Sequence, residues 1–316
     1  MGKQVLKGIH KFRHIEVVPG GASYGFGTYN TLGRTYFVNN ITGSSTGGGT
    51  TWDTATDEIS TAITASEVYR QDRGSVSTND YIRNTIVVQA TGTAYSAVST
   101  LPSYTDIIGL GATTRGNGTG IVRIDGGGAD AMAGTARGLG LYNLQCMQSS
   151  AVSFYGLDLA TCFRSTIESC GFVNNGSGGI RVVQGGSIVM NDVHCGHDTY
   201  AQLYGLYVAG GANFNACLIT DSDFWGDTAG VLMSNTSGKE TIIKNCFAGG
   251  GTYGFQDTSP SDMPHMVHYI KCYGKGTAST TINSAGFKLT NVYTERAIGC
   301  IENCNGTLRN YPSTAD

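Results

Sequence analysis

Cysteine returns at nearly even intervals along the second half of the chain. Seven of the nine cysteines are separated by successive steps of 24, 25, 22, 29, 26 and 28 residues. They are Cys146, Cys170, Cys195, Cys217, Cys246, Cys272 and Cys300. A second marker, a glycine followed by an apolar residue, recurs with steps of 23, 26, 25, 24 and 32 residues at Gly156, Gly179, Gly205, Gly230, Gly254 and Gly286. Two markers with similar periods indicate a repeat architecture, in which each repeat contacts only its neighbours.

The repeat unit consists of short strands and turns. Segments between the markers, such as "GIRVV" and "ETIIKNC", alternate apolar and polar residues and show no helical period. The chain contains 47 glycines, and each would cost a helix about 1 kcal/mol at an interior position. A period near 25 residues built only from strands predicts one coil of a right-handed parallel β-helix. Three short strands per coil would pair with those of the next coil, about 4.8 Å away.

The recurring cysteine is expected to occupy one inward position, stacked coil upon coil as a structural ladder. Cysteine behaves as a small hydrophobe and fits a narrow interior. Disulfides between coils are the first alternative, but the odd count of nine cysteines and the expected cytoplasmic synthesis count against them. A metal site at His194, Cys195 and His197 is the second alternative. The chain has no CxxC pair, and a flat ladder cannot surround one ion, so we predict no metal and no cofactor.

Residues 35–72 read differently from the repeats. The strand "TYFVNN" leads into a loop, after which Asp53 or Thr54 is expected to cap a helix of about four turns. The predicted apolar face of this amphipathic helix is Ala55, Ile59, Ala62 and Ile63, with Ser66 at its edge. Since the open end of a solenoid would otherwise expose its apolar interior, we interpret this segment as a cap.

The order of motifs at this entry resembles a known superfamily. The strand, "TTWDTA", the helix, "TIVV", "GTAY" and "DIIGLG" are similar to the N-terminal signature of the pectate-lyase-like parallel β-helix proteins. The resemblance covers about residues 35–125, and the coil pattern extends it to about residue 305. In that superfamily such a sequence opens polysaccharide-active enzymes and bacteriophage tailspikes. The resemblance implies a fold and leaves the function open, because one fold hosts many functions.

The catalytic patterns that the superfamily implies are absent. No proline lies in an R-x-P-x-x-R context, and the polygalacturonase elements N-T-D and G-H-G are missing. An unmarked glycosidase needs two carboxylates on one exposed face. The candidate catalytic residues are Asp198, Asp221 and Asp223, and the candidate carbohydrate-binding residues are Tyr200, Tyr204 and Trp225. The competing interpretation is that Asp in "TDSD" and "GHD" serves turns, as do the glycines of "DGGGAD".

Charge and hydropathy restrict the partners of the chain. The net charge of −3 does not suit a nucleic-acid binder, which needs a basic face. No apolar run is long enough to span a membrane, and the N-terminus lacks the apolar core of a signal peptide. Synthesis in a host cytoplasm is therefore expected. Lys3, Lys7, Lys11 and Arg13 make the first residues basic, either as a solvated terminus or as an attachment arm.

These observations predict three segments: an N-terminal attachment arm over 1–34, a capping strand and helix over 35–72, and a parallel β-helix over 73–316. The resemblance implies a virion surface protein of a bacteriophage (a tailspike, head fibre or capsid-decorating subunit). Such a protein would be a homotrimer that attaches to other virion proteins by its arm and contacts host surface polysaccharide without catalysing a reaction. The alternative is a polysaccharide depolymerase, a lyase or a glycosidase, on the same fold.

Overall fold

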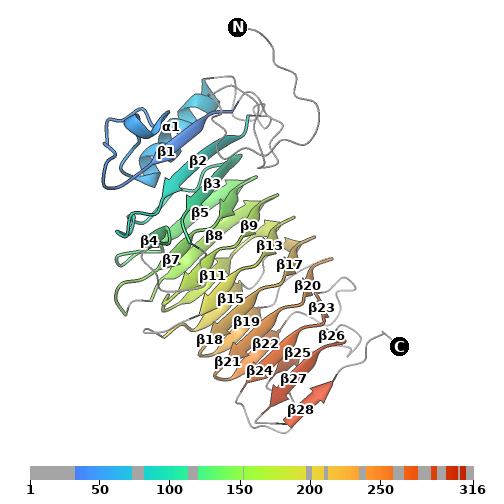
Figure 1. Ribbon diagram of the computed structural model, residues 1–316. Coiled ribbons are helices and arrows are strands. Elements are labelled where there is room, and N and C mark those ends of the chain that lie inside the picture. Colours follow the sequence, from blue (N-terminus) through green and yellow to red (C-terminus); the bar gives the residue numbers. More distant parts are fainter. Residues whose placement is uncertain are drawn as a thin grey trace, which may run out of the picture.

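The protein forms an elongated stack of coils, with the N-terminal helix at one end and the last strands at the other (Figure 1). The structure is a computed structural model that describes residues 33–72, 82–112, 120–151, 153–196, 201–209, 213–234, 240–258, 267–276, 286–289, 297–304 and 307–310. The expected attachment residues Lys3, Lys7, Lys11 and Arg13 lie outside the described residues, as do Asp198 and Tyr200.

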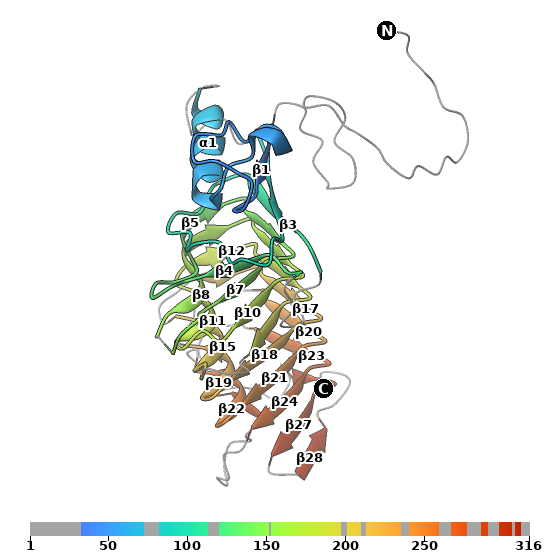
Figure 2. The ribbon, with the colours of Figure 1, turned by 60° about the vertical axis from the view of Figure 1, so that its left-hand side comes forward.

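Three sheets run the length of the stack and form its walls (Figure 2). Sheet A contains, in spatial order, β1 (Thr35–Val38), β2 (Asn84–Gln89), β3 (Thr105–Leu110), β6 (Gly140–Tyr142), β9 (Thr166–Glu168), β13 (Val189–Asn191), β17 (Leu218–Thr220), β20 (Ile242–Lys244), β23 (His268–Ile270) and β26 (Ala297–Ile298). Sheet B contains β4 (Arg123–Asp125), β7 (Gln145–Met147), β10 (Gly171–Val173), β14 (His194–Gly196), β18 (Asp223–Gly226), β21 (Phe247–Gly250), β24 (Tyr273–Gly276), β27 (Ile301–Cys304) and β28 (Thr307–Asn310). Sheet C contains β16 (Phe214–Asn215), β12 (Gly185–Gly186), β8 (Tyr155–Phe163), β11 (Gly178–Val182), β15 (Tyr204–Val208), β19 (Ala229–Met233), β22 (Tyr253–Asp257) and β25 (Phe287–Leu289), and β5 (Met132–Arg137) pairs with β8.

The chain visits the sheets in the order A, B, C and then starts the next coil. The described strands pair in parallel with the equivalent strands of neighbouring coils; the exception is β28, which returns antiparallel to β27. This arrangement confirms the predicted all-β fold, a right-handed parallel β-helix of about seven turns. Apart from a register shift in the β5–β8 pair after Gly134, the parallel pairing places equivalent residues of successive coils above one another. Rows of side chains therefore run along the axis on the inner and outer faces.

The glycine marker of the sequence corresponds to one such row in sheet C. The apolar residues that follow the six glycines pair with one another in an unbroken column: Leu157, Ile180, Leu206, Val231, Phe255 and Phe287. All are buried in the interior. The preceding glycines let the backbone approach the opposite wall, because a Cβ on Gly179 would lie 2.8 Å from Cys195 Sγ and one on Gly205 would lie 2.7 Å from Phe224 Cβ.

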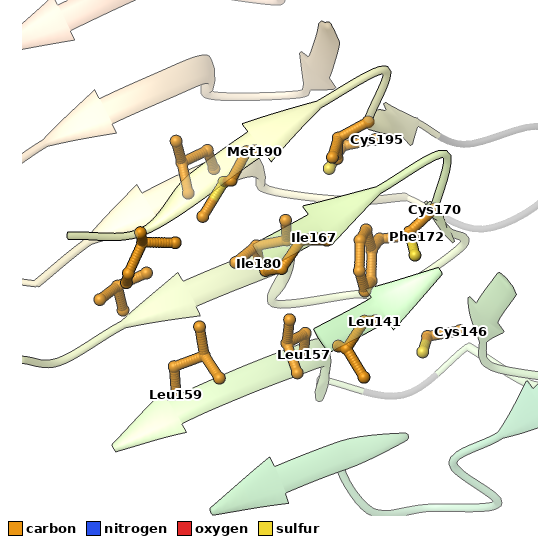
Figure 3. Packing of buried hydrophobic residues seen from close by; sticks show 14 of the residues in the cluster. Leu141, Cys146, Leu157, Leu159, Ile167, Cys170, Phe172, Ile180, Met190 and Cys195 are labelled. Carbon is orange, nitrogen blue, oxygen red and sulfur yellow. The ribbon is translucent and has the colours of Figure 1, made fainter. Parts of the chain in front are cut away.

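The seven cysteines of the first marker are buried, but they do not form the single ladder that the sequence predicted. Cys146 and Cys195 lie within strands of sheet B, with Phe172 between them in the same column (Figure 3). Cys170, Cys246, Cys272 and Cys300 directly precede strands of sheet B, and Cys217 directly precedes a strand of sheet A. Cysteine therefore occupies three different interior columns: one within the strands of sheet B, one directly before those strands, and one directly before the strands of sheet A. Within one column, thiols of consecutive coils contact one another, since the Cys272 side chain hydrogen-bonds with those of Cys246 and Cys300. None of the eight cysteines from Cys146 to Cys300 forms a disulfide.

Tight corners connect sheet A to sheet B. One residue at each corner takes a left-handed backbone conformation with φ between 50° and 61°: Asn143, Ser169, Asp192, Asp221, Asn245, Lys271 and Gly299. Asn and Asp tolerate this conformation better than most residues. A second set of corners, from sheet C to sheet A, uses Tyr104, Gly138, Arg164, Ser187, Ala216 and Glu240 in the same way. The corners turn the chain within one or two residues and keep the coils in register.

The N-terminal end is covered by α1 (Ile59–Gln71), which packs against β1 and β2 (Figure 2). Its buried residues include Ile59, Ala62, Ile63 and Ser66, as expected for the apolar face. Ser66 is accepted in the interior because Asn84 Nδ2 donates to its Oγ at 2.9 Å. The start of the helix differs from the prediction. Thr51 caps a separate 3-10 turn, η1 (Trp52–Thr54), and α1 begins only after Glu58, so neither Asp53 nor Thr54 is its N-cap.

Candidate functional site

Aromatic side chains of three consecutive coils stack on the outer face of sheet B. Trp225 lies in β18, Phe247 in β21 and Tyr273 in β24. The ring centroids of Trp225 and Phe247 are 4.8 Å apart, and those of Phe247 and Tyr273 are 5.5 Å apart in a stacked geometry. The Nζ atom of Lys275 lies 5.9 Å from the centroid of the Trp225 ring. We call Trp225, Phe247 and Tyr273 the aromatic row. It forms a partly exposed apolar strip with a cation beside it.

Gly249 determines how the indole of Trp225 lies. The register places Gly249 beside Trp225 on the next strand. A Cβ at this glycine would lie 2.6 Å from Cε3 and Cζ3 of Trp225, so the indole lies flat across the strand where a side chain would otherwise stand. Trp225 remains 38% exposed. A partly exposed indole can make an apolar contact with a ligand.

A histidine and a carboxylate lie at one end of the aromatic row. The register pairs His194 in β14 with Asp223 in β18, and His194 Nδ1 and Asp223 Oδ2 are joined by a hydrogen bond. Both side chains are partly exposed, by 29% and 24%. Asp223 precedes Phe247 in the same outward row. The face thus combines a polar pair, an apolar strip and the ammonium group of Lys275.

The residues predicted from sequence separate into different parts of the surface. Asp223 and Trp225 both face outward from β18, as a carbohydrate-contacting surface would require. Asp221 occupies a left-handed corner with φ of 50°, and Asn245 Nδ2 donates to its carboxylate at 3.2 Å. This is the turn role that the competing interpretation assigned to it. Tyr204 lies on sheet C, where its ring stacks on Tyr207 with centroids 5.2 Å apart.

Sheet C carries a second cluster of polar groups on its outer face. Asp158 in β8 pairs with Arg181 in β11, and Arg181 Nε donates to Asp158 Oδ1 at 2.7 Å. The guanidinium also lies over the ring of Tyr155, at 4.6 Å from its centroid. Asp130 lies close to Asp158 and Arg181. The backbone N–H of Tyr155, whose ring contacts Arg181, donates a hydrogen bond to Asp130 Oδ1 at 2.7 Å. Two carboxyl groups and one guanidinium therefore share this part of the face.

Burial and neighbouring charge raise the pKa of one of the two carboxyl groups, that of Asp130. Burial raises the pKa of Asp130, and the negative charge of Asp158 raises it further. The hydrogen bond to Asp158 raises the pKa of the Arg181 guanidinium in turn. A carboxyl group with a raised pKa beside a carboxylate that is hydrogen-bonded to an arginine is a combination used for acid–base chemistry.

Sequence reasoning missed this second cluster. Asp130 lies in "DGGGAD", which reads as a glycine turn, and Asp158 lies inside an apolar strand. A usable signal was present. In each repeat the marker glycine is followed by an inward apolar residue and then by an outward residue. The outward residue of "GLD" (156–158) is Asp158, and that of "GIR" (179–181) is Arg181, so the two lie side by side in successive coils.

The described residues contain no group of three or more His, Cys, Asp or Glu side chains arranged to hold a metal ion. Within the same residues no helix has the length and apolar character to cross a membrane.

The fold places the chain among the parallel β-helices that display side chains on long outer faces. A crystal structure of a pectin methylesterase in complex with a hexasaccharide aligns with a TM-score of 0.51 at 12% sequence identity, covering 89% of this chain and 92% of that chain. A crystal structure of a mutant of a pectin methylesterase with another hexasaccharide aligns over the same shares at 13% identity, with a TM-score of 0.49. At such identities the likeness concerns the fold alone. No protein-family profile and no curated protein matches the sequence.

Proposed function

We propose that the protein binds a polysaccharide on the outer face of sheet B. The observation that carries this proposal is the aromatic row, which continues over three coils. Neighbouring strands are about 4.8 Å apart, a spacing similar to the repeat of pyranose units in an extended polysaccharide. Successive aromatic side chains can therefore contact successive sugars, while His194, Asp223 and Lys275 supply hydrogen bonds to hydroxyl groups. Exposed apolar strips with polar rims are typical of binding surfaces.

The pectin methylesterase that aligns with a TM-score of 0.51 supports this class of ligand, because its structure is a complex with a hexasaccharide.

The two tryptophans of the sequence provide the test. Trp225 and Trp52 are almost equally exposed, at 38% and 39%, but Trp52 lies in η1 beside Phe37, away from the aromatic row. Polysaccharides from bacterial capsules and plant cell walls would be screened by affinity gel electrophoresis. We expect Trp225→Ala to weaken binding to the retarding polysaccharide about tenfold, and Trp52→Ala to leave it unchanged. Equal effects of the two substitutions, or no retardation by any polysaccharide, would contradict the proposal.

A second candidate function is hydrolysis of a polysaccharide, the enzymatic alternative, at the cluster on sheet C. The specific observation in its favour is the raised pKa of Asp130 beside Asp158. Asp130 would donate a proton to the leaving glycosidic oxygen. Asp158, oriented by Arg181, would take a proton from the water that attacks the anomeric carbon, so that the bond to water forms as the glycosidic bond breaks. The assay is the release of reducing ends from the retarding polysaccharide. Asp130→Asn and Asp158→Asn should each abolish release, whereas Asp221→Asn should not. An unchanged polysaccharide after prolonged incubation with the unaltered protein would exclude this function.

We further propose that the chain is a homotrimeric surface protein of a phage particle, attached through its N-terminal arm. The resemblance of residues 35–125 to the pectate-lyase-like superfamily, which includes tailspikes, supports this. An exposed apolar row on the outer face of sheet A supports association: Val189, Leu218 and Ile242 pair in register, and the first two are 38% and 39% exposed. Light scattering of the purified protein should give three times the chain mass, and Leu218→Lys should reduce it to one. Absence of the chain from purified particles would refute the virion assignment.

A further inference from the structure

A hollow lies at the corner where sheet C turns into sheet A, away from the aromatic row. Its volume is about 500 Å³, and its lining includes Arg137, Phe163, Arg164, Gly186, Ser187 and Asn215. A volume of this order is typical of small-ligand sites. We call it the corner groove.

Two rows of stacked residues shape the corner groove. The first row is the end of sheet C, where the register pairs Arg137 with Phe163, Phe163 with Gly186, and Gly186 with Asn215. Gly186 leaves a gap in this row. A Cβ at that position would lie 3.2 Å from Phe163 Cδ1 and 3.3 Å from its Cε1, so the phenyl ring forms a wall beside the gap.

The second row consists of the left-handed corner residues. Arg164 has φ of 54°, and its neighbours along the row, Gly138, Ser187 and Ala216, have small side chains. The long side chain of Arg164 therefore stands among small residues, and the hollow opens beside it. Backbone groups in the floor are already paired, since Arg164 N–H donates to Gly186 O at 2.9 Å and Ser187 N–H donates to Asn215 O at 2.8 Å.

The guanidinium groups of Arg137 and Arg164 are exposed. Within the described part of the chain neither of them forms an ion pair, in contrast to Arg83, Arg70 and Arg181, which are paired with carboxylates. No lining residue is acidic. The nearest acid in the corner row is Glu240, beyond Ala216, and it lies about three strand spacings, roughly 14 Å, from Arg164. The groove is a local concentration of positive charge on a chain whose net charge is −3.

We infer that the corner groove binds a sugar residue that carries an anionic group, such as a carboxylate or a phosphate ester. Guanidinium groups bind such anions through paired, charge-assisted hydrogen bonds. The ring of Phe163 supplies an apolar wall for the face of the sugar. The inference does not depend on the proposed function, because the aromatic row is on sheet B and the groove is at the junction of sheets C and A.

Ligand-observed NMR titration of the full chain tests this inference. The probes are methyl glucuronoside, glucose 6-phosphate, methyl glucoside and inorganic phosphate. Both anionic sugars are expected to bind, methyl glucoside is not, and inorganic phosphate should bind at least tenfold more weakly than glucose 6-phosphate. Arg137→Gln and Arg164→Gln should each weaken binding about tenfold, the effect of losing a hydrogen bond between charged groups. Higher salt should weaken it as well.

Three control variants show whether binding takes place in the corner groove itself. Lys244→Ala removes one exposed positive charge on sheet A and should change nothing. Phe163→Leu keeps an apolar residue and should lower the affinity for glucose 6-phosphate to that for inorganic phosphate. Trp225→Ala should leave binding unchanged, so that failure of the sheet B site and failure of the groove are distinguishable. The inference is overturned if no anionic sugar binds, if the glutamine variants bind normally, or if inorganic phosphate binds as tightly as the sugar phosphate.

Discussion

Gly205→Ala tests the packing on which the whole coil depends. Gly205 belongs to the glycine marker and lies in β15. A Cβ at this position would lie 2.5 Å from Gly230 O, 2.7 Å from Phe224 Cβ and 3.0 Å from Phe224 Cα. None of these atoms belongs to the flexible end of a side chain. The clash can be relieved only by moving β15 away from its neighbour or from the opposite wall.

The expected cost follows from two opposing terms. Overpacking of a rigid interior costs about 1–3 kcal/mol, and the lower entropy of the unfolded chain with alanine returns about 0.4–1 kcal/mol. Because the contacts are made by backbone atoms and a Cβ, we expect the overpacking term to lie in its upper half. Gly205→Ala should therefore lower the free energy of unfolding by about 1–2.6 kcal/mol.

Gly48→Ala is the matched control, since a Cβ there meets no atom within 4 Å and the residue has no left-handed backbone. Its free energy of unfolding should equal or slightly exceed that of the unaltered protein. The measurement is urea denaturation followed by circular dichroism, with the midpoints of the three proteins compared. If Gly205→Ala is as stable as Gly48→Ala, the two walls do not approach as described, and the glycine marker has no packing role.

Three further predictions concern the faces and the interior. Gly249→Ala places a methyl group 2.6 Å from the Trp225 ring, so it should displace the indole and weaken polysaccharide binding about as much as Trp225→Ala. In a Trp52→Phe background the displaced indole should also show shifted fluorescence, and unchanged fluorescence would contradict the prediction. The raised pKa of Asp130 means that this group stabilises the fold while protonated and that its contribution is lost as the pH rises through its folded-state pKa; Asp130→Asn should therefore be more stable than the unaltered protein at neutral pH and equal to it below about pH 4, as measured by thermal denaturation, and a lower stability at neutral pH would refute this. Burial raises the pKa of Cys170 to about 12 and that of Cys217 to about 11, so in a Cys304→Ser variant a thiol reagent at about pH 8 should label cysteine only after denaturant is added, and rapid labelling of the native protein would contradict the interior position of the thiols.

The fold was predictable because period and composition are both visible in the sequence. The glycine marker identified a true structural column, since each glycine sits where the walls approach and each following residue is interior. The cysteine marker had the correct period but not one column. Cys146 lies within β7, whereas Cys170 precedes β10, and a step of 24 residues does not distinguish these neighbouring interior positions.

The sites were predictable only in part. Asp223 and Trp225 were found because they are close in sequence and both polar or aromatic. Tyr204 was grouped with them, but a corner separates the end of a sheet B strand from the start of a sheet C strand. Contacts between coils, such as that between Asp158 and Arg181, depend on residues 23 positions apart and become visible only when the register is known.

The in-register stacking of the coils separates recognition from stability. Along β18 the side chains alternate, so that Phe224 is buried while Asp223 and Trp225 on either side face outward. A substitution at an outward position changes one point of contact in a linear array and leaves the interior intact. In the proposed polysaccharide site, the preference for a ligand can therefore change one sugar position at a time, and the length of ligand recognised grows with the number of consecutive coils that carry suitable residues.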